Sequence, residues 1–195
     1  MSHHTPAVYL VRHGETEWAR DGRHTGLSDI PLTAVGEQAA KAMTNTLNGL
    51  IINQVWTSPL QRAKRTCELA GFGAQAQTEA DLVEWNYGDY EGRRSAEIHR
   101  ENPTWSVFRD GCPNGEMPAQ IGARADRLVA RLRTATGATL IFSSGHLLRA
   151  LAARWLGLPV EAGSTLALST ASLSVLGYEH SDRDPVILLW NQQQR

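Results

Sequence analysis

The stretch VYLVRHGETEW, residues 8–18, places an apolar run directly before two side chains that bind anions or exchange protons. Residues 8–11 are rich in β-forming types, so we expect a short buried strand. The run ends at Arg12 and His13, and Gly14 follows at once. A buried strand that ends on such residues predicts a functional site at its carboxyl end.

Strands and helices alternate along the rest of the chain. Residues 55–57 and 139–143 are typical of short strands, and we expect Pro59 to occupy the first position of the helix after residue 57. Thr33 is expected to cap a helical stretch over residues 37–47, and the other expected helices cover residues 95–101 and 119–133 and a segment that runs through Trp155. The other expected strands cover residues 82–83, 172–178 and 186–190. This alternation predicts an α/β fold, a three-layer αβα sandwich with a mainly parallel central sheet.

Ligands of such sheets bind beyond the carboxyl ends of the strands. Arg12 and His13 stand at the end of one expected strand, Ser58 follows another, and His146 follows a third. We therefore expect these side chains to lie at the same edge of the sheet.

Composition narrows the class of protein. The chain has 195 residues and a formal net charge of -1, which does not suggest nucleic-acid binding. Cys67 and Cys112 form neither a disulfide framework nor a zinc spacing, which favours reduced thiols and a cytoplasmic location. No apolar run approaches membrane-spanning length, and His3 and His4 are not taken as metal ligands. We expect a single domain over residues 1–195 and leave the oligomeric state, including a homodimer, open.

Five motifs occur in a fixed order and together resemble one known family. The resemblance is to the histidine phosphatase superfamily, also called the phosphoglycerate mutase-like family, and it extends from Val8 to Trp190. The motifs are RHGETEW at 12–18, HTGLSDIPLT at 24–33, TSPLQRAKRT at 57–66, EWNYGDYEG at 84–92 and SSGHLLRAL at 143–151. The resemblance implies that family's fold, with a small lid at about residues 84–118.

The resemblance also implies roles in phosphoryl transfer. His13 corresponds to the nucleophile, which attacks phosphorus and forms a phosphohistidine. Arg12 and Arg62 supply planar guanidinium groups that match phosphate oxygens, and His146 in its cationic form binds the transferring oxygens. Gly14 leaves the second ring nitrogen of His13 room to donate to a backbone carbonyl, which fixes the attacking tautomer.

Glu84 matches the family's general acid. The neighbouring Leu82, Val83 and Trp85 predict apolar surroundings, which would keep its carboxyl group protonated. Two other acids of the same loop, Asp89 and Glu91, remain alternatives.

Thr25 and Gly26 lie in a segment that borders the pocket in relatives, where Thr25 binds phosphate or caps a turn. We expect no metal and no cofactor, because the arginines and a cationic histidine supply the positive charge that phosphoryl transfer requires.

Two departures from the mutases favour the phosphatase branch. Ala19 stands where the mutase pattern has Asn, and residues 92–115 lack the basic insertion of the mutases. The expected function is hydrolysis of phosphate monoesters of small metabolites, sugar phosphates or bisphosphates among them. Arg93, Arg94 and His99 either receive a second phosphate or form a solvated basic face. A mutase-type phosphoryl transferase and a non-catalytic phosphate-binding module are the alternatives.

Overall fold

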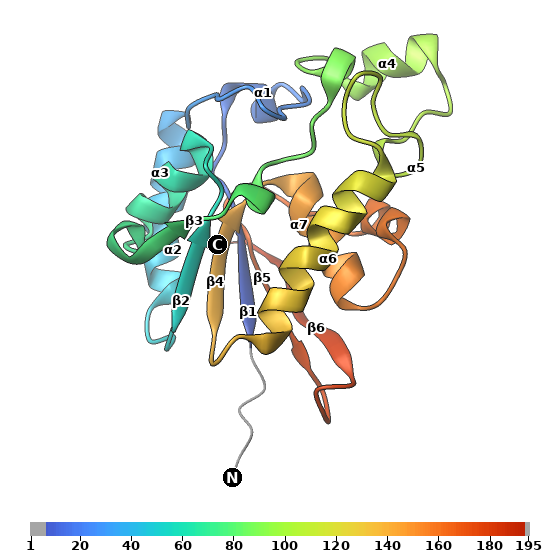
Figure 1. Ribbon diagram of the computed structural model, residues 1–195. Coiled ribbons are helices and arrows are strands. Elements are labelled where there is room, and N and C mark those ends of the chain that lie inside the picture. The colour runs from blue at the N-terminus through green and yellow to red at the C-terminus, as the bar shows by residue number, and fades with distance from the viewer. Residues whose placement is uncertain (1–6, 194–195) are drawn as a thin grey trace.

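The computed structural model describes residues 7–193, and its centre is a six-stranded sheet in the order β3-β2-β4-β1-β5-β6 (Figure 1). His3 and His4 lie outside the described residues. The strands are β1 (Val8–Arg12), β2 (Gln54–Thr57), β3 (Ala76–Thr78), β4 (Thr139–Ser143), β5 (Leu173–Tyr178) and β6 (Pro185–Gln192). The α-helices are α1 (Glu17–Arg20), α2 (Ala34–Leu47), α3 (Gln61–Leu69), α4 (Ser95–Glu101), α5 (Val107–Asp110), α6 (Pro118–Thr134) and α7 (Gly145–Trp155). The 3-10 helices are η1 (Gly73–Gln75), η2 (Ala80–Leu82), η3 (Gly88–Tyr90) and η4 (Val160–Thr165).

The first four strands of this order, β3, β2, β4 and β1, are parallel, whereas β5 pairs antiparallel with β1 and β6 pairs antiparallel with β5. In the central pair, Arg12 of β1 lies opposite Ser143 of β4. The carboxyl ends of these two strands therefore meet at one edge of the sheet. The expected mainly parallel α/β fold is confirmed.

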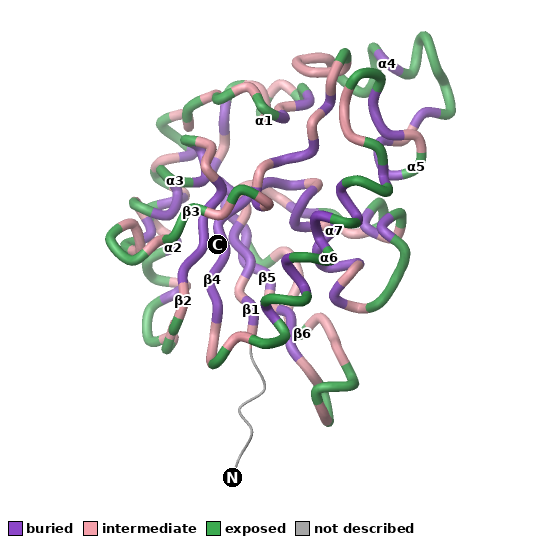
Figure 2. The backbone as a smooth tube through the Cα atoms, viewed as in Figure 1, coloured by how far each residue is buried: buried purple, intermediate pink, exposed green. Residues whose placement is uncertain are grey.

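Helices cover both faces of the sheet because successive strand residues point to opposite sides (Figure 1). Val11 and Phe142 pack in a cluster that also contains α2 and α3 residues. Their neighbours Leu10 and Ile141 join the opposite cluster, which is filled by α6 and α7. All five residues of β4 are buried, and Figure 2 shows buried residues, in purple, concentrated in the central strands.

Two local predictions are wrong, each because a residue distant in sequence forms a hydrogen bond with the segment. The helix after β2 does not begin at Pro59: Leu60 is its N-cap, and the amide of Gln61 donates to the Asp29 side chain, 2.7 Å away. Residues 82–83 do not form an edge strand. Leu82 ends the 3-10 helix η2, and the carbonyl of Val83 accepts a hydrogen bond from Arg124 in place of a neighbouring strand. The edge position belongs to β3 instead.

Residues 84–118, with α4 and α5, lie above the carboxyl ends of the strands (Figure 1). The loop after β1 lies at the same end of the molecule. Within residues 7–193, no helix combines the length and the hydropathy needed to cross a bilayer.

Candidate active site

His13 follows β1 and is only 4% exposed. Its Nδ1 atom lies 2.8 Å from the carbonyl oxygen of Gly14, and its backbone amide donates to the carbonyl of Ser143. Burial holds the pKa of His13 well below its ordinary value, and the nearby charges of Arg62 and Arg12 lower it further. The imidazole is therefore neutral near pH 7, with Nδ1 engaged and Nε2 carrying the lone pair that a nucleophile needs.

The two arginines beside His13 are held by backbone carbonyls. Arg62 is fully buried, and its terminal nitrogens donate to the carbonyls of Thr25, Gly26 and Ser28 at 2.8 to 3.0 Å. Arg12 donates through Nη1 to the carbonyl of Leu168. Burial lowers the pKa of each arginine, and the negative charge of Glu84 offsets part of that effect. Both guanidinium groups are thus fixed in place before any ligand arrives.

Close backbone packing sets the turn that carries His13. A Cβ on Gly14 would lie 2.4 Å from the carbonyl oxygen of Gly36, so only glycine fits against the start of α2. The Gly14 amide donates to the hydroxyl of Thr66, which in turn donates to the carbonyl of Arg62. One threonine of α3 therefore connects the turn with the helix that carries the second arginine.

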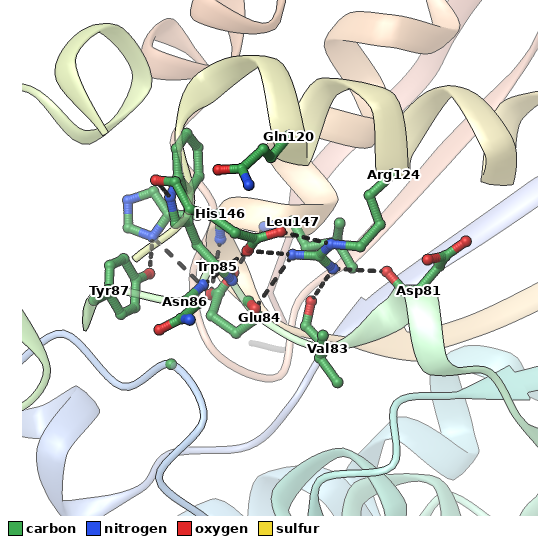
Figure 3. A network of polar contacts seen from close by, with 12 residues as sticks. Asp81, Val83, Glu84, Trp85, Asn86, Tyr87, Gln120, Arg124, His146 and Leu147 are labelled. Carbon is green, nitrogen blue, oxygen red and sulfur yellow. Dashed lines mark hydrogen bonds and ion pairs between the residues drawn. The ribbon is translucent and has the colours of Figure 1, made fainter. Parts of the chain in front are cut away.

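Glu84 is 4% exposed and accepts three backbone hydrogen bonds, two of them from the start of α7 (Figure 3). The donors are the amides of Trp85, His146 and Leu147, at 2.8 to 3.0 Å. The sequence predicted apolar surroundings for this acid, and the structure instead places amide donors around its two oxygens. The reason is that α7, distant in sequence, directs its free N-terminal amides at the loop.

Arg124 of α6 holds the segment that leads into Glu84 (Figure 3). Its guanidinium group donates to the carbonyls of Asp81, Val83 and Glu84 and forms an ion pair with Glu116 at 2.8 Å. Within the loop, the amide of Asn86 donates to the carboxylate of Glu116, and the indole of Trp85 donates to the carbonyl of Glu116. This clamp fixes the loop at the edge of the site.

His146 lies in an aromatic cluster, where its Nδ1 atom is 2.6 Å from the hydroxyl of Tyr87 (Figure 3). Burial raises the pKa of Tyr87 well above its ordinary value, so the phenol keeps its proton and forms a hydrogen bond with Nδ1. Burial lowers the pKa of His146, with Arg149, His24 and Arg12 adding to the effect. Without a bound anion the ring is neutral, so the cationic form expected from the sequence needs a negatively charged ligand.

His24 belongs to the same aromatic cluster. Its ring centroid lies 4.8 Å from that of Tyr87 and 6.1 Å from that of His146, and its Nε2 atom is 3.2 Å from the hydroxyl of Ser95 in α4. Burial and the charge of His99 lower the pKa of His24 to about 4. The neutral ring of His24 thereby connects the segment after α1 with α4 above the sheet.

Thr25 and Gly26 position Arg62 through their carbonyls, and the Thr25 hydroxyl itself donates to the carbonyl of Arg23. The alternative acids have other partners. Asp89 binds the side chain of Asn114, and Glu91 accepts from the amides of Gly26 and Ser28. Of the three loop acids, Glu84 alone is placed beside His146, with 4.0 Å between its Oε2 and the ring Nδ1.

Two residues of this arrangement are absent from the sequence prediction. Nothing local in the sequence marks Tyr87 as the partner of His146. Arg124 had a readable signal: it follows Ile121 and precedes Leu128 at helical spacing, so it is a charge on the apolar face of α6. Within residues 7–193, no group of three or more His, Cys, Asp or Glu side chains is arranged to hold a metal ion.

Similarity to known proteins extends over almost the whole chain. An acid phosphatase of Mycobacterium tuberculosis is 40% identical over 185 residues, which are 93% of this chain and 91% of that protein. A sedoheptulose 1,7-bisphosphatase of Saccharomyces cerevisiae is 37% identical, over 80% of this chain and 70% of the relative. Further relatives of 33% to 36% identity carry the name "Probable phosphoglycerate mutase GpmB".

The three-dimensional structure is also similar to solved structures over almost the whole chain. The solved structure of the protein from open reading frame Rv3214 of Mycobacterium tuberculosis matches with a TM-score of 0.90 and 36% identity, over 96% of this chain and 97% of that one. A family model described as histidine phosphatase superfamily, branch 1, matches residues 8–193. The chain therefore belongs to the histidine phosphatase superfamily.

Proposed function

We propose that the protein is a phosphatase that hydrolyses phosphate monoesters of small metabolites through a phosphohistidine on His13. The observation that carries the proposal is the state of that ring: buried, neutral, engaged at Nδ1 and flanked by Arg12 and Arg62. Family membership and relatives named acid phosphatase and sedoheptulose bisphosphatase support the same reaction class.

In the first step, the Nε2 lone pair of His13 attacks phosphorus and the bond from phosphorus to the ester oxygen breaks. Arg12 and Arg62 hold the phosphoryl oxygens and neutralise their charge. Glu84, protonated at Oε2, which accepts a single amide, delivers that proton to the departing oxygen, which leaves as the alcohol. His146 becomes cationic when the dianionic ligand binds and adds positive charge at the same oxygens.

In the second step, water attacks the phosphohistidine. Glu84, now a carboxylate, takes one proton of that water, the bond from phosphorus to Nε2 breaks, and inorganic phosphate leaves. The imidazole is regenerated with its Nδ1 contact to Gly14 unchanged. Fixed arginines supply the positive charge throughout, so the proposed reaction needs no metal ion.

Hydrolysis of p-nitrophenyl phosphate by purified protein in EDTA tests this proposal. We expect turnover in EDTA, acid-labile incorporation of labelled phosphate, and loss of both in His13→Ala. His180→Ala is the matched control, since that histidine is exposed and remote from the site. Activity that EDTA removes and magnesium restores would show that the proposed mechanism is wrong.

The role of Glu84 has its own test, because a general acid matters most for a poor leaving group. Glu84→Gln should lower kcat/KM, which reports transfer to His13, about a hundredfold for an alkyl phosphate and far less for p-nitrophenyl phosphate. Asp89→Asn and Glu91→Gln serve as controls on the same loop. Equal losses of kcat/KM for both substrates in Glu84→Gln would contradict a role in protonating the leaving group.

Residues 84–118 are proposed as a lid that selects the substrate. Two of the residues considered for a second phosphate already have protein partners, since Arg93 forms an ion pair with Glu101 and His99 contacts the carbonyl of Trp105. These contacts favour monophosphates over a dedicated bisphosphate site. Assays of paired sugar monophosphates and bisphosphates distinguish the two substrate classes.

Mutase activity is the second candidate, supported by the relatives that carry that name. A mutase returns the phosphoryl group to a sugar acid faster than to water, so the ratio of transfer to hydrolysis with phosphoglycerate separates the two reactions. A protein that binds phosphate but performs neither reaction would be a binding module. Homodimer formation, measured by sedimentation, and the cytoplasmic location inferred from two reduced thiols remain predictions of the sequence.

A further inference from the structure

Buried polar atoms without a partner gather around His13. Within residues 7–193, four buried side-chain atoms lack a hydrogen-bond partner: Arg12 Nε, Arg62 Nε, Ser144 Oγ and Thr139 Oγ1. Thr139 begins β4 at the far end of the sheet, whereas the other three belong to the carboxyl end. A buried donor left unpaired is unfavourable, so three at one place indicate a ligand that completes them. The two arginines already belong to the proposed site, and Ser144 is the addition.

The hydroxyl of Ser144 has no partner among the described residues because Glu84 accepts the helix amides that an N-cap serine normally binds. Ser144 is the N-cap of α7, a position where serine normally accepts from the amides of the first helical turn. Here Glu84 accepts from the amides of His146 and Leu147, at 3.0 and 2.8 Å. The preceding Ser143 is buried too, but its hydroxyl donates to the carbonyl of Leu82 at 2.7 Å. Of the two adjacent serines, one is satisfied within the protein and the other is not.

Strand register places Ser144 beside the nucleophile. β1 and β4 are neighbouring parallel strands in which Arg12 lies opposite Ser143, and the His13 amide donates to the Ser143 carbonyl at 2.9 Å. The next residue of each strand brings Ser144 alongside His13. The Arg12 side chain lies across Gly145, where a Cβ would be 3.2 Å from Nε. The unpaired Nε of Arg12 therefore lies against the residue that directly follows Ser144.

We propose that the Ser144 hydroxyl donates a hydrogen bond to the phosphoryl group held at His13. The inference rests on the proposed function, and it names a phosphoryl-binding residue that the sequence prediction did not contain. Ser144 is fully buried, so its hydroxyl gains a charged acceptor without competition from water. The ligand is an oxygen of a phosphate monoester, of the phosphohistidine or of inorganic phosphate.

Two alanine variants one residue apart test the proposal, with inorganic phosphate as the probe. Titration calorimetry measures phosphate affinity, and urea unfolding in phosphate-free buffer measures stability. Ser144→Ala should bind phosphate about tenfold more weakly and be no less stable than wild type without phosphate, since the lost hydroxyl had no partner. Ser143→Ala should show the opposite pattern: lower stability without phosphate, and affinity within twofold of wild type.

Unchanged phosphate affinity in Ser144→Ala would overturn the proposal, as would a loss of phosphate-free stability equal to that of Ser143→Ala. Ser144→Cys, which keeps the size but weakens the donor, should bind with intermediate affinity and repeats the test if the alanine variant does not fold. Binding is measured without turnover, so the two proposals fail separately. If the wild type does not hydrolyse phosphate esters but Ser144→Ala still weakens phosphate binding, only the proposed hydrolysis is wrong. If the wild type is active but Ser144→Ala binds phosphate as tightly as wild type, only this inference is wrong.

Discussion

The residues around His13 and the segment above them are held by different forces. Around His13, Arg62 is bound by three carbonyls and is fully buried, and Arg12 is bound by a carbonyl and lies partly buried beside the start of α7. In residues 92–110, by contrast, Arg93 and Arg109 form ion pairs near the surface, Arg93 with Glu101 and Arg109 with Asp110. Buried carbonyl contacts fix a position, whereas exposed pairs are weak and exchange with water.

This difference separates the chemistry from the choice of substrate. A phosphoryl group needs charges that do not move during the reaction, and carbonyls of the surrounding loops supply that rigidity. A segment held by exposed ion pairs can change sequence at little expense in stability. Variants of the two regions should therefore differ strongly in their effects, and the predictions below compare them.

The largest effect should come from Arg62→Met, which removes a buried charge from the phosphoryl site. We expect kcat/KM to fall about a thousandfold, which corresponds to about 4 kcal/mol of lost transition-state stabilisation. Arg65→Met is the control on the same helix, because Arg65 faces outward and pairs with Glu37 and Glu68. A loss below tenfold in Arg62→Met, with the fold checked by circular dichroism, would contradict the comparison.

The second-largest effect should come from Arg124→Met, and it should be a loss of stability. It leaves the carboxylate of Glu116 without its partner and frees three carbonyls of the loop before Glu84. Loss of one member of a buried ion pair costs about 3 to 5 kcal/mol of unfolding free energy, measured by urea titration. Arg127→Met, whose exposed side chain pairs with Asp81, should unfold close to wild type. Similar midpoints for the two variants would show that the clamp contributes nothing.

Acid should destabilise the protein partly through His24. Its pKa is about 4 in the folded protein and near the ordinary value when unfolded, so the unfolded chain binds the proton first. The contribution is present above about pH 6.5 and is lost as the pH falls towards 4, up to about 3 kcal/mol. Unfolding of His24→Gln should therefore depend less on pH than that of wild type, whereas His180→Gln should match wild type. If the unfolding free energies of all three proteins change with pH in parallel, His24 does not contribute to the acid sensitivity.

The smallest effect should come from Arg93→Gln in the segment above the sheet. Arg93 is paired with Glu101 near the surface, so its loss should change kcat/KM for sugar monophosphates and bisphosphates less than twofold. A loss above tenfold that is confined to bisphosphates would break the comparison. It would also assign this arginine to a second phosphate.

The sequence by itself determined five of the six strands described, most helices and the family. Short β-forming runs around residues 8–11 and 139–143, and helical spacing around residues 119–133, are local patterns that tertiary packing left unchanged. Arg12, His13 and Arg62 were found for the same reason, since each lies in a motif that is contiguous along the chain. Their convergence follows from the rule that parallel strands end at one edge.

Only the tertiary structure decided which partner each polar group has. Glu84 accepts from an amide 63 residues away, Tyr87 binds a histidine 59 residues away, and Arg124 binds carbonyls more than 40 residues before it. The unpaired hydroxyl of Ser144 follows from the first of these contacts, because Glu84 takes the amides that serine would cap. Hydrogen bonds between distant segments leave no periodicity in a sequence, so they are defined only when the segments pack together.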